Sequence, residues 1–171
     1  MKNQLKIINN GYMYQRGIGM KFFRVTTEYG VTDQWHSVPH HGTDLAMPIG
    51  TEIHSPIDGT VIAVKDLGNW NAGKYIKVRT EDGNTDLIFG HLSEFKVKIG
   101  DHVEKGDLLA LSGNTGNSTG PHLHLGARDA HTGEWINPEK WVDIFQEISA
   151  EILGFILMGV KFVGSIIFSL V

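Results

Sequence analysis

The 171-residue chain contains no cysteine. This absence excludes a disulfide framework, thiolate catalysis and any metal site built on cysteine ligands. A block of basic residues is also lacking, and 15 Lys and Arg stand against 19 Asp and Glu, which gives a formal net charge of −4. We therefore expect no nucleic-acid partner.

Proline is scarce, with five residues, whereas glycine occurs 21 times. From position 22 onward, short β-branched or aromatic stretches alternate with turn residues, a pattern typical of an all-β domain. No helical periodicity of domain length occurs within 22–136, so we expect a mainly antiparallel sheet. The expected strands are 22–27, 51–54, 59–64, 74–80, 85–91, 108–111 and 122–127, with a hairpin turn at Asp58-Gly59.

The two ends of the chain differ from this central region. Residues 1–21 form a polar extension without the apolar segment of a secretory signal. Asn137-Pro138-Glu139 has the residue types of a helix start, and apolar residues then recur at helical spacing. We accordingly divide the chain into an extension (1–21), a domain (22–139) and a C-terminal helix (140–171).

The last part of the C-terminal helix, 152–171, is apolar on all sides apart from Lys161 and two serines. As a helix it would measure roughly 30 Å, the thickness of a bilayer core. We therefore expect this apolar segment to interact with membrane lipid. A buried helix or a contact between subunits is the alternative.

Two short motifs carry the chemistry. In His40-His41-Gly42-Thr43-Asp44, an extended chain places His40 and Asp44 on one face with the side-chain-free Gly42 between them. In His122-Leu123-His124, a strand places both imidazoles on one face. His40, Asp44 and one histidine of the second motif would give three protein ligands and one open position, which is the catalytic form of a zinc site.

Together with Gly90-His91-Leu92 and the stretch 113–124, these motifs resemble peptidase family M23, the zinc metallopeptidases of the lysostaphin and LytM type. The resemblance extends over about residues 22–139 and implies an all-β fold with an open groove. It also implies one zinc ion per chain on His40, Asp44 and His124. His91 and His122 would then be catalytic histidines that do not bind the metal, and which of them is the general base stays open.

The same resemblance implies a zinc metalloendopeptidase that cuts cross-links or stem peptides of bacterial peptidoglycan. Asn117, Ser118 and Thr119 lie in a loop of small residues, which is either a cleft wall that holds substrate or an ordinary connector. We expect His41 to neighbour the site and His54 to be a strand residue with satisfied ring nitrogens. Aromatic residues that could line the cleft or serve only packing are Trp35, Trp70 and Tyr75; histidines expected in solvent are His36, His102 and His131.

A wall-degrading domain joined to an apolar segment suggests two settings. One is the tail tip of a phage virion, where the protein would contact other tail proteins and open the host wall during infection. The other is a membrane-associated lysis enzyme of the bacterial membrane or cell envelope. A non-catalytic protein that binds peptidoglycan or builds the tail is the remaining alternative. A biotinyl or lipoyl carrier domain is excluded because no Met-Lys-Met or Asp-Lys-Ala tripeptide occurs.

Overall fold

The computed structural model describes residues 6–8, 12–14, 23–32 and 38–152. Two short strands, β1 (Lys6–Ile8) and β2 (Tyr12–Tyr14), pair with each other as a separate antiparallel sheet. The expected domain boundary at 21/22 lies outside the described residues.

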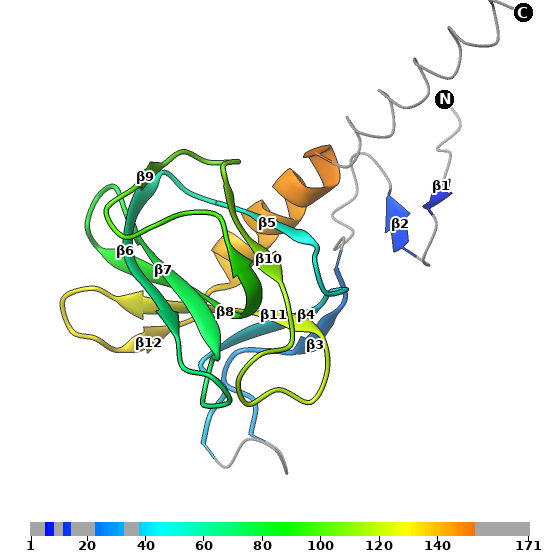
Figure 1. Ribbon diagram of the computed structural model, residues 1–171, viewed down its shortest axis with the longest axis horizontal. Helices are drawn as coiled ribbons and strands as arrows, with labels where there is room; N and C mark the ends of the chain where they lie inside the picture. The colour runs from blue at the N-terminus through cyan, green and yellow to red at the C-terminus, as the bar shows by residue number, and fades with distance from the viewer. Residues whose placement is uncertain (1–5, 9–11, 15–22, 33–37, 153–171) are drawn as a thin grey trace, which may run out of the picture.

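Ten strands form the main sheet, and all of their pairings are antiparallel. The order is β3-β4-β11-β8-β7-β6-β9, with β10 paired to β5 and β8, and β12 paired to β11 (Figure 1). The predicted fold class is therefore confirmed. The strands are β3 (Val25–Thr27), β4 (Gly42–Ala46), β5 (Glu52–His54), β6 (Gly59–Asp66), β7 (Lys74–Thr80), β8 (Thr85–Phe95), β9 (His102–Val103), β10 (Leu108–Ser112), β11 (His122–Asp129) and β12 (Trp135–Ile136).

Strand alternation separates the core from the face that carries the site. Leu123 and Leu125 of β11 are fully buried, as are Leu87 and Phe89 of the neighbouring β8. Because successive side chains of a strand point to opposite faces, His122 and His124 lie on the other side of the same sheet. The hydrophobic core thus fixes the direction of both imidazoles.

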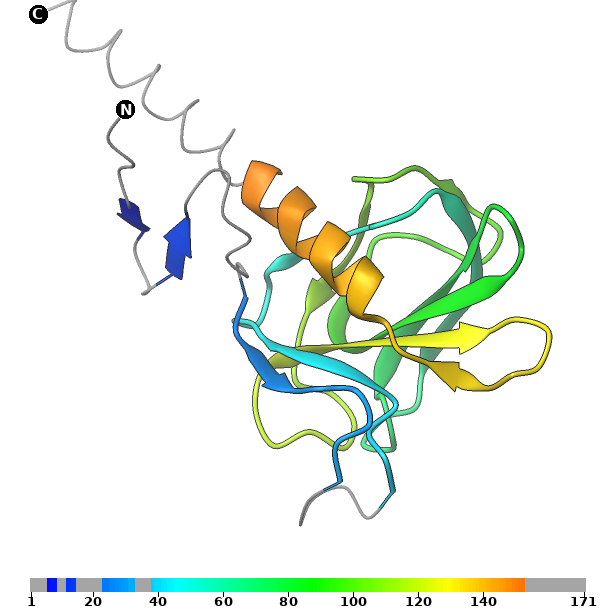
Figure 2. The same ribbon diagram turned by 180° about the vertical axis from the view of Figure 1, so that it is seen from behind.

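A helix of residues 139–152 closes one side of this core. Asn137 caps it as predicted, since its side-chain oxygen accepts a hydrogen bond of 3.0 Å from the backbone N–H of Glu139. Phe145 is fully buried, and its ring lies 6.1 Å from that of Phe23. Figure 2 shows the helix leaving β12 and crossing the back of the molecule.

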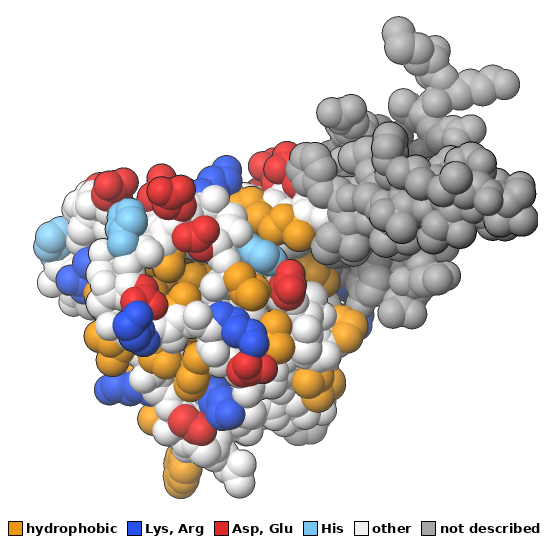
Figure 3. All heavy atoms as spheres, turned by 45° about the horizontal axis from the view of Figure 1, so that its top comes forward, with side chains coloured by type: hydrophobic (Ala, Val, Ile, Leu, Met, Phe, Trp, Pro, Cys, Tyr) orange, Lys and Arg blue, Asp and Glu red, His pale blue; other side chains and the backbone are white. Residues whose placement is uncertain are grey.

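Within 6–8, 12–14, 23–32 and 38–152, no helix is both long and apolar enough to cross a membrane. The apolar segment 152–171 lies outside the described residues except for its first position. On the face drawn in Figure 3, acidic, basic and hydrophobic side chains are interspersed.

The predicted hairpin at Asp58-Gly59 is wrong. β5 pairs with β10, and β6 pairs with β7 and β9, so the chain passes between different neighbours at this point instead of turning back on itself. Gly59 has another reason to be glycine: an added Cβ would lie 2.2 Å from the carbonyl oxygen of Arg79 on β7. A close approach of two backbones, and not a turn, therefore requires it.

Candidate metal centre

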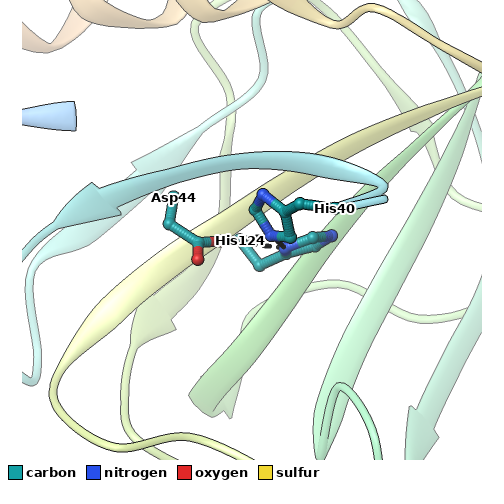
Figure 4. Close-up of side chains that lie close together, drawn as sticks. All are labelled: His40, Asp44 and His124. Atoms are coloured by element: carbon teal, nitrogen blue, oxygen red, sulfur yellow. Dashed lines mark hydrogen bonds and ion pairs between the residues drawn. The ribbon is translucent and has the colours of Figure 1, made fainter. Parts of the chain in front are cut away.

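Two adjacent strands bring the first motif to the second. β4 and β11 pair with Asp44 directly opposite His124, and His40 lies two residues before β4 begins. Figure 4 shows the three side chains converging on one point, Asp44 from β4 and His124 from β11. The strand faces predicted from the sequence are the ones that the structure uses.

The donor atoms of these three residues form a compact triangle. His124 Nδ1 lies 2.9 Å from Asp44 Oδ1, His40 Nε2 lies 3.2 Å from the same oxygen, and the two ring nitrogens are 3.1 Å apart. Two ligand atoms of a tetrahedral zinc ion are roughly 3.3 Å apart, given bond lengths of about 2.0–2.1 Å. His40, Asp44 and His124 thus fit the dimensions of a divalent metal site.

Each ligand is held in place by its surroundings. The Nδ1 of His40 lies 3.1 Å from the carbonyl oxygen of Glu28, so an Nδ1–H donates there and the Nε2 lone pair faces the other ligands. The His124 ring lies over Gly42, where an added Cβ would approach Nε2 to 2.6 Å. The absence of a side chain at Gly42 therefore leaves the space that the His124 ring occupies.

Charge and burial agree with a cation site. Asp44 is 7% exposed, and burial alone would raise the pKa of its carboxyl group. In the metal-free site, the close contacts with the His124 and His40 rings outweigh burial and hold that pKa well below its ordinary value. The carboxylate is consequently ionised and turned toward the ring nitrogens, as a metal ligand must be.

Two further imidazoles flank the triangle. His91 and His122 have ring centroids 4.4 Å apart, and His122 Nε2 lies 3.7 Å from Asp44 Oδ1. The Nδ1 of His91 donates to the carbonyl of Thr115 at 2.7 Å, and that of His122 donates to the carbonyl of Gly120 at 2.8 Å. In its neutral form each ring therefore keeps an unprotonated Nε2 that can accept a proton.

His91 differs from His122 in its environment. It is 7% exposed, and burial, together with the nearby His122, lowers its pKa from 6.5 to about 4. Its backbone φ of 62° lies in the left-handed region, as does the φ of 48° at Asn71. Such conformations persist where surrounding contacts impose them, and both residues line the same cleft.

The cleft over the triangle has a volume of about 540 Å³. The three residues of the predicted substrate loop, Asn117, Ser118 and Thr119, form one of its walls. The backbone N–H of Asn117 donates to the carbonyl of Asn71 at 2.8 Å. This wall is thus fixed to the neighbouring loop between β6 and β7, and whether it holds substrate stays a prediction.

A second cavity of about 240 Å³ adjoins the first cleft. The two share Asn71, His91 and His124 in their walls, so the second cavity borders the candidate metal site. Strand alternation could have placed its residues on one sheet face, but the sequence alone did not show which strands are neighbours. The lining residues that sequence reasoning missed are Asn71, Lys77, Arg128 and Trp135.

The remaining predicted residues have simpler roles. His41 is a neighbour and not part of the ligand triangle, since its ring stacks on Trp135 at 4.8 Å. The ring nitrogens of His54 lie 2.8 Å from the carbonyl oxygen of Gly106 and 3.1 Å from the carboxylate of Glu52. Tyr75 lines the smaller cavity, and Trp70 is 80% exposed. His102 and His131 are exposed as expected, whereas Trp35 and His36 lie outside the described residues.

Three ligands, two additional imidazoles and an open cleft define the class of site that metal-dependent hydrolases use. The chain belongs to peptidase family M23, whose family model matches residues 38–138. The sequence resemblance to this family is thereby confirmed.

Individual relatives show how far the similarity extends. The peptidoglycan DD-endopeptidase ShyA of Vibrio cholerae is 37% identical over 147 residues, which cover 70% of this chain and 33% of ShyA. The glycyl-glycine endopeptidase ALE-1 of Staphylococcus capitis is 39% identical over 86 residues, which cover 50% of this chain and 24% of ALE-1. The chain therefore spans a third or less of the length of these curated relatives.

Among solved structures, the catalytic domain of the antimicrobial peptidase lysostaphin from Staphylococcus simulans superimposes with a TM-score of 0.64 and 28% identity. This match covers 70% of the present chain and 92% of that domain. The main sheet and the cleft thus correspond to nearly a whole peptidase catalytic domain.

Proposed function

We propose that the protein is a zinc-dependent endopeptidase that hydrolyses peptide bonds in bacterial peptidoglycan. The observation that carries the proposal is the ligand triangle of His40, Asp44 and His124, with two imidazoles beside it, at the floor of an open cleft. The named activities of ShyA and ALE-1 support the substrate class.

A zinc ion on the three ligands would supply Lewis acidity and lower the pKa of bound water from 15.7 to about 7. His91 and His122 would transfer the protons that hydrolysis of the peptide bond requires. Their Nδ1–H groups are engaged by the Thr115 and Gly120 carbonyls, so whichever ring is the general base would accept the proton of the attacking water at Nε2. Once protonated, the same Nε2 donates to the leaving amine or to the carbonyl oxygen that gains negative charge.

The non-catalytic alternative has less support. A protein that only binds peptidoglycan does not need two further imidazoles, oriented by backbone carbonyls, beside the ligand triangle.

The test is hydrolysis of purified peptidoglycan, followed by mass spectrometry of the released peptides. We expect fragments from the protein with zinc, none after chelation, and recovery when zinc is returned. His40→Ala, Asp44→Ala and His124→Ala should lose metal and activity together. His91→Ala and His122→Ala should lose activity and keep most of the zinc; loss of bound zinc in both would contradict the division of roles.

We also propose a setting for this activity, a phage virion tail that opens the wall locally while residues 152–171 contact membrane lipid. The apolar composition of this segment supports the proposal. Detection of the protein in purified virions is the expected result. Its absence there, combined with presence in a bacterial membrane fraction, would favour the lysis-enzyme alternative.

A further inference from the structure

The smaller cavity beside the metal site contains two cations close together. Lys77 on β7 and Arg128 on β11 both line it, with Trp135 and Tyr75 as aromatic walls. Both cations lie on the face of the sheet that carries His124, because Lys77 is opposite Ile88 on β8, and Ile88 is opposite Gly126 on β11. In a chain with a net charge of −4, this is a local excess of positive charge.

Within the described residues, neither cation of this pair forms an ion pair with a carboxylate. Asp86 is the nearby acid, but both of its oxygens are engaged by Arg79, at 2.7 and 3.0 Å. Arg128 donates to the carbonyl of Gly133 and lies over the ring of Trp135, and neither it nor Lys77 forms an ion pair within the described residues. Burial and the charge of Arg128 lower the pKa of Lys77, whereas the charge of Asp86 acts in the opposite direction.

The cavity also adjoins the reaction centre. It shares Asn71, His91 and His124 with the main cleft, so a peptide that lies over the ligand triangle and contacts the loop of Ser118 and Thr119 can extend toward Lys77. Resting on the function proposed above, we infer that Lys77 and Arg128 form a subsite for a carboxylate of the peptide being cut. The substrate is then an acidic stem peptide and not an uncharged glycine bridge.

Arg128 has a second task that limits its use as a probe. Its guanidinium group donates to the Gly133 carbonyl and thereby holds the turn between β11 and β12. The guanidinium position is therefore fixed in advance, and Lys77 supplies the unpaired donor. Lys77→Met removes the charge while keeping an unbranched side chain of similar length, so Lys77 is the residue to change.

The test compares four cross-linked peptides of one sequence. The first has all carboxylates free, the second has its side-chain carboxylates amidated, the third has an amidated C-terminus, and the fourth replaces the stem by glycine. Cleavage is measured as kcat/KM with the zinc-supplemented full chain. The variants are Lys77→Met, Lys77→Arg as the conservative replacement, and Lys105→Met as a control at an exposed lysine that lines neither cavity.

We expect the kcat/KM of the wild type to be about tenfold higher for the free peptide than for one of the amidated forms. This factor corresponds to a hydrogen bond to a charged group in a partly exposed site. Lys77→Met should lose this preference, whereas Lys77→Arg and Lys105→Met should keep it. Whichever amidated peptide is cut less efficiently than the free peptide shows whether the subsite binds a side-chain carboxylate or the C-terminal carboxylate. Equal cleavage of all four peptides, or an unchanged preference in Lys77→Met, would overturn the inference and leave the endopeptidase proposal standing.

The two proposals are separated by a binding measurement. With chelator present no peptide is cut, and the affinities of the same four peptides are compared by calorimetry. Carboxylate-dependent binding that Lys77→Met abolishes, in a protein that hydrolyses none of the peptides with zinc, would refute the peptidase activity alone. Binding without any dependence on a carboxylate would refute the subsite.

Discussion

Replacing Gly42 with alanine tests whether β4 positions a metal ligand on β11. An added Cβ would lie 2.6 Å from Cε1 and Nε2 of His124 and 2.8 Å from the carbonyl oxygen of Leu125. Gly42 is not among the glycines with positive φ, so alanine suits its backbone conformation. These close contacts with the His124 ring and the Leu125 carbonyl are therefore the strain that the substitution introduces.

The size of the effect follows from these distances. Restoring an ordinary contact of 3.4 Å moves the His124 ring by about 0.8 Å, and the Leu125 backbone resists a shift of the strand instead. Metal–ligand distances tolerate about 0.2 Å. We expect zinc affinity to fall by at least tenfold, as for the loss of a group that orients a ligand, and stability to fall by about 1–3 kcal/mol from overpacking.

Zinc affinity is measured by competition with a chromophoric chelator, and folding by circular dichroism and urea denaturation of the metal-free protein. Gly120→Ala is the matched control, since a Cβ at Gly120 meets nothing within 4 Å. It should keep the zinc affinity of the wild type. Wild-type affinity in a folded Gly42→Ala protein would refute the claim that this glycine holds the ring.

Two further predictions concern the groups around His91. Thr115→Val removes the hydroxyl that donates to the Leu92 carbonyl at 2.8 Å and accepts from the Lys74 N–H at 3.0 Å, so the free energy of unfolding should drop by about 1–3 kcal/mol in urea titrations; an unchanged midpoint would show that water replaces both bonds. His91→Asn tests pH dependence in the metal-free protein. Because the folded pKa is about 4 and the unfolded value 6.5, the unfolded chain binds the proton first as pH falls. Wild-type stability should thus be complete above pH 6.5 and decline toward pH 4 by at most ~1.4 kcal/mol per pH unit. Asparagine accepts the φ of 62° and does not titrate, so a decline of equal slope in His91→Asn would assign it to other groups.

Much of the site follows from strand periodicity. The two-residue repeat correctly places His40 on the same side as Asp44 and His122 on the same side as His124. On β11 the burial of Leu123 and Leu125 in the core turns the two histidines to the other face. The repeat does not say that positions 80 residues apart become opposite partners. That pairing of Asp44 with His124 came from the resemblance to the peptidase family, and the β4–β11 register bears it out.

The failures have a common physical cause. Asp58-Gly59 has favourable local turn chemistry, but Ser55 donates its N–H to the carbonyl of Asp107 and accepts from the N–H of Gly106. These distant bonds draw β5 toward β10 and away from β6. Lys77 and Arg128 were missed for the same reason, since only the order of β7, β8 and β11 brings them to one cavity.

The main chain, and not a network of side chains, sets the protonation pattern of this site. Carbonyl groups of Glu28, Thr115 and Gly120 each engage the Nδ1 of one imidazole, and Gly42 positions the fourth ring through contact. A backbone carbonyl accepts but never donates, so it selects one tautomer at every pH where the ring is neutral. The loop that supplies Thr115 and Gly120 also forms a cleft wall, and the Asn117–Asn71 hydrogen bond ties that wall to the loop between β6 and β7. The residues that shape the substrate path are therefore the same segments that orient the proton carriers. Insertions in this loop should alter chemistry and specificity together, whereas changes in the exposed turn between β7 and β8, which lines neither cavity, leave both alone.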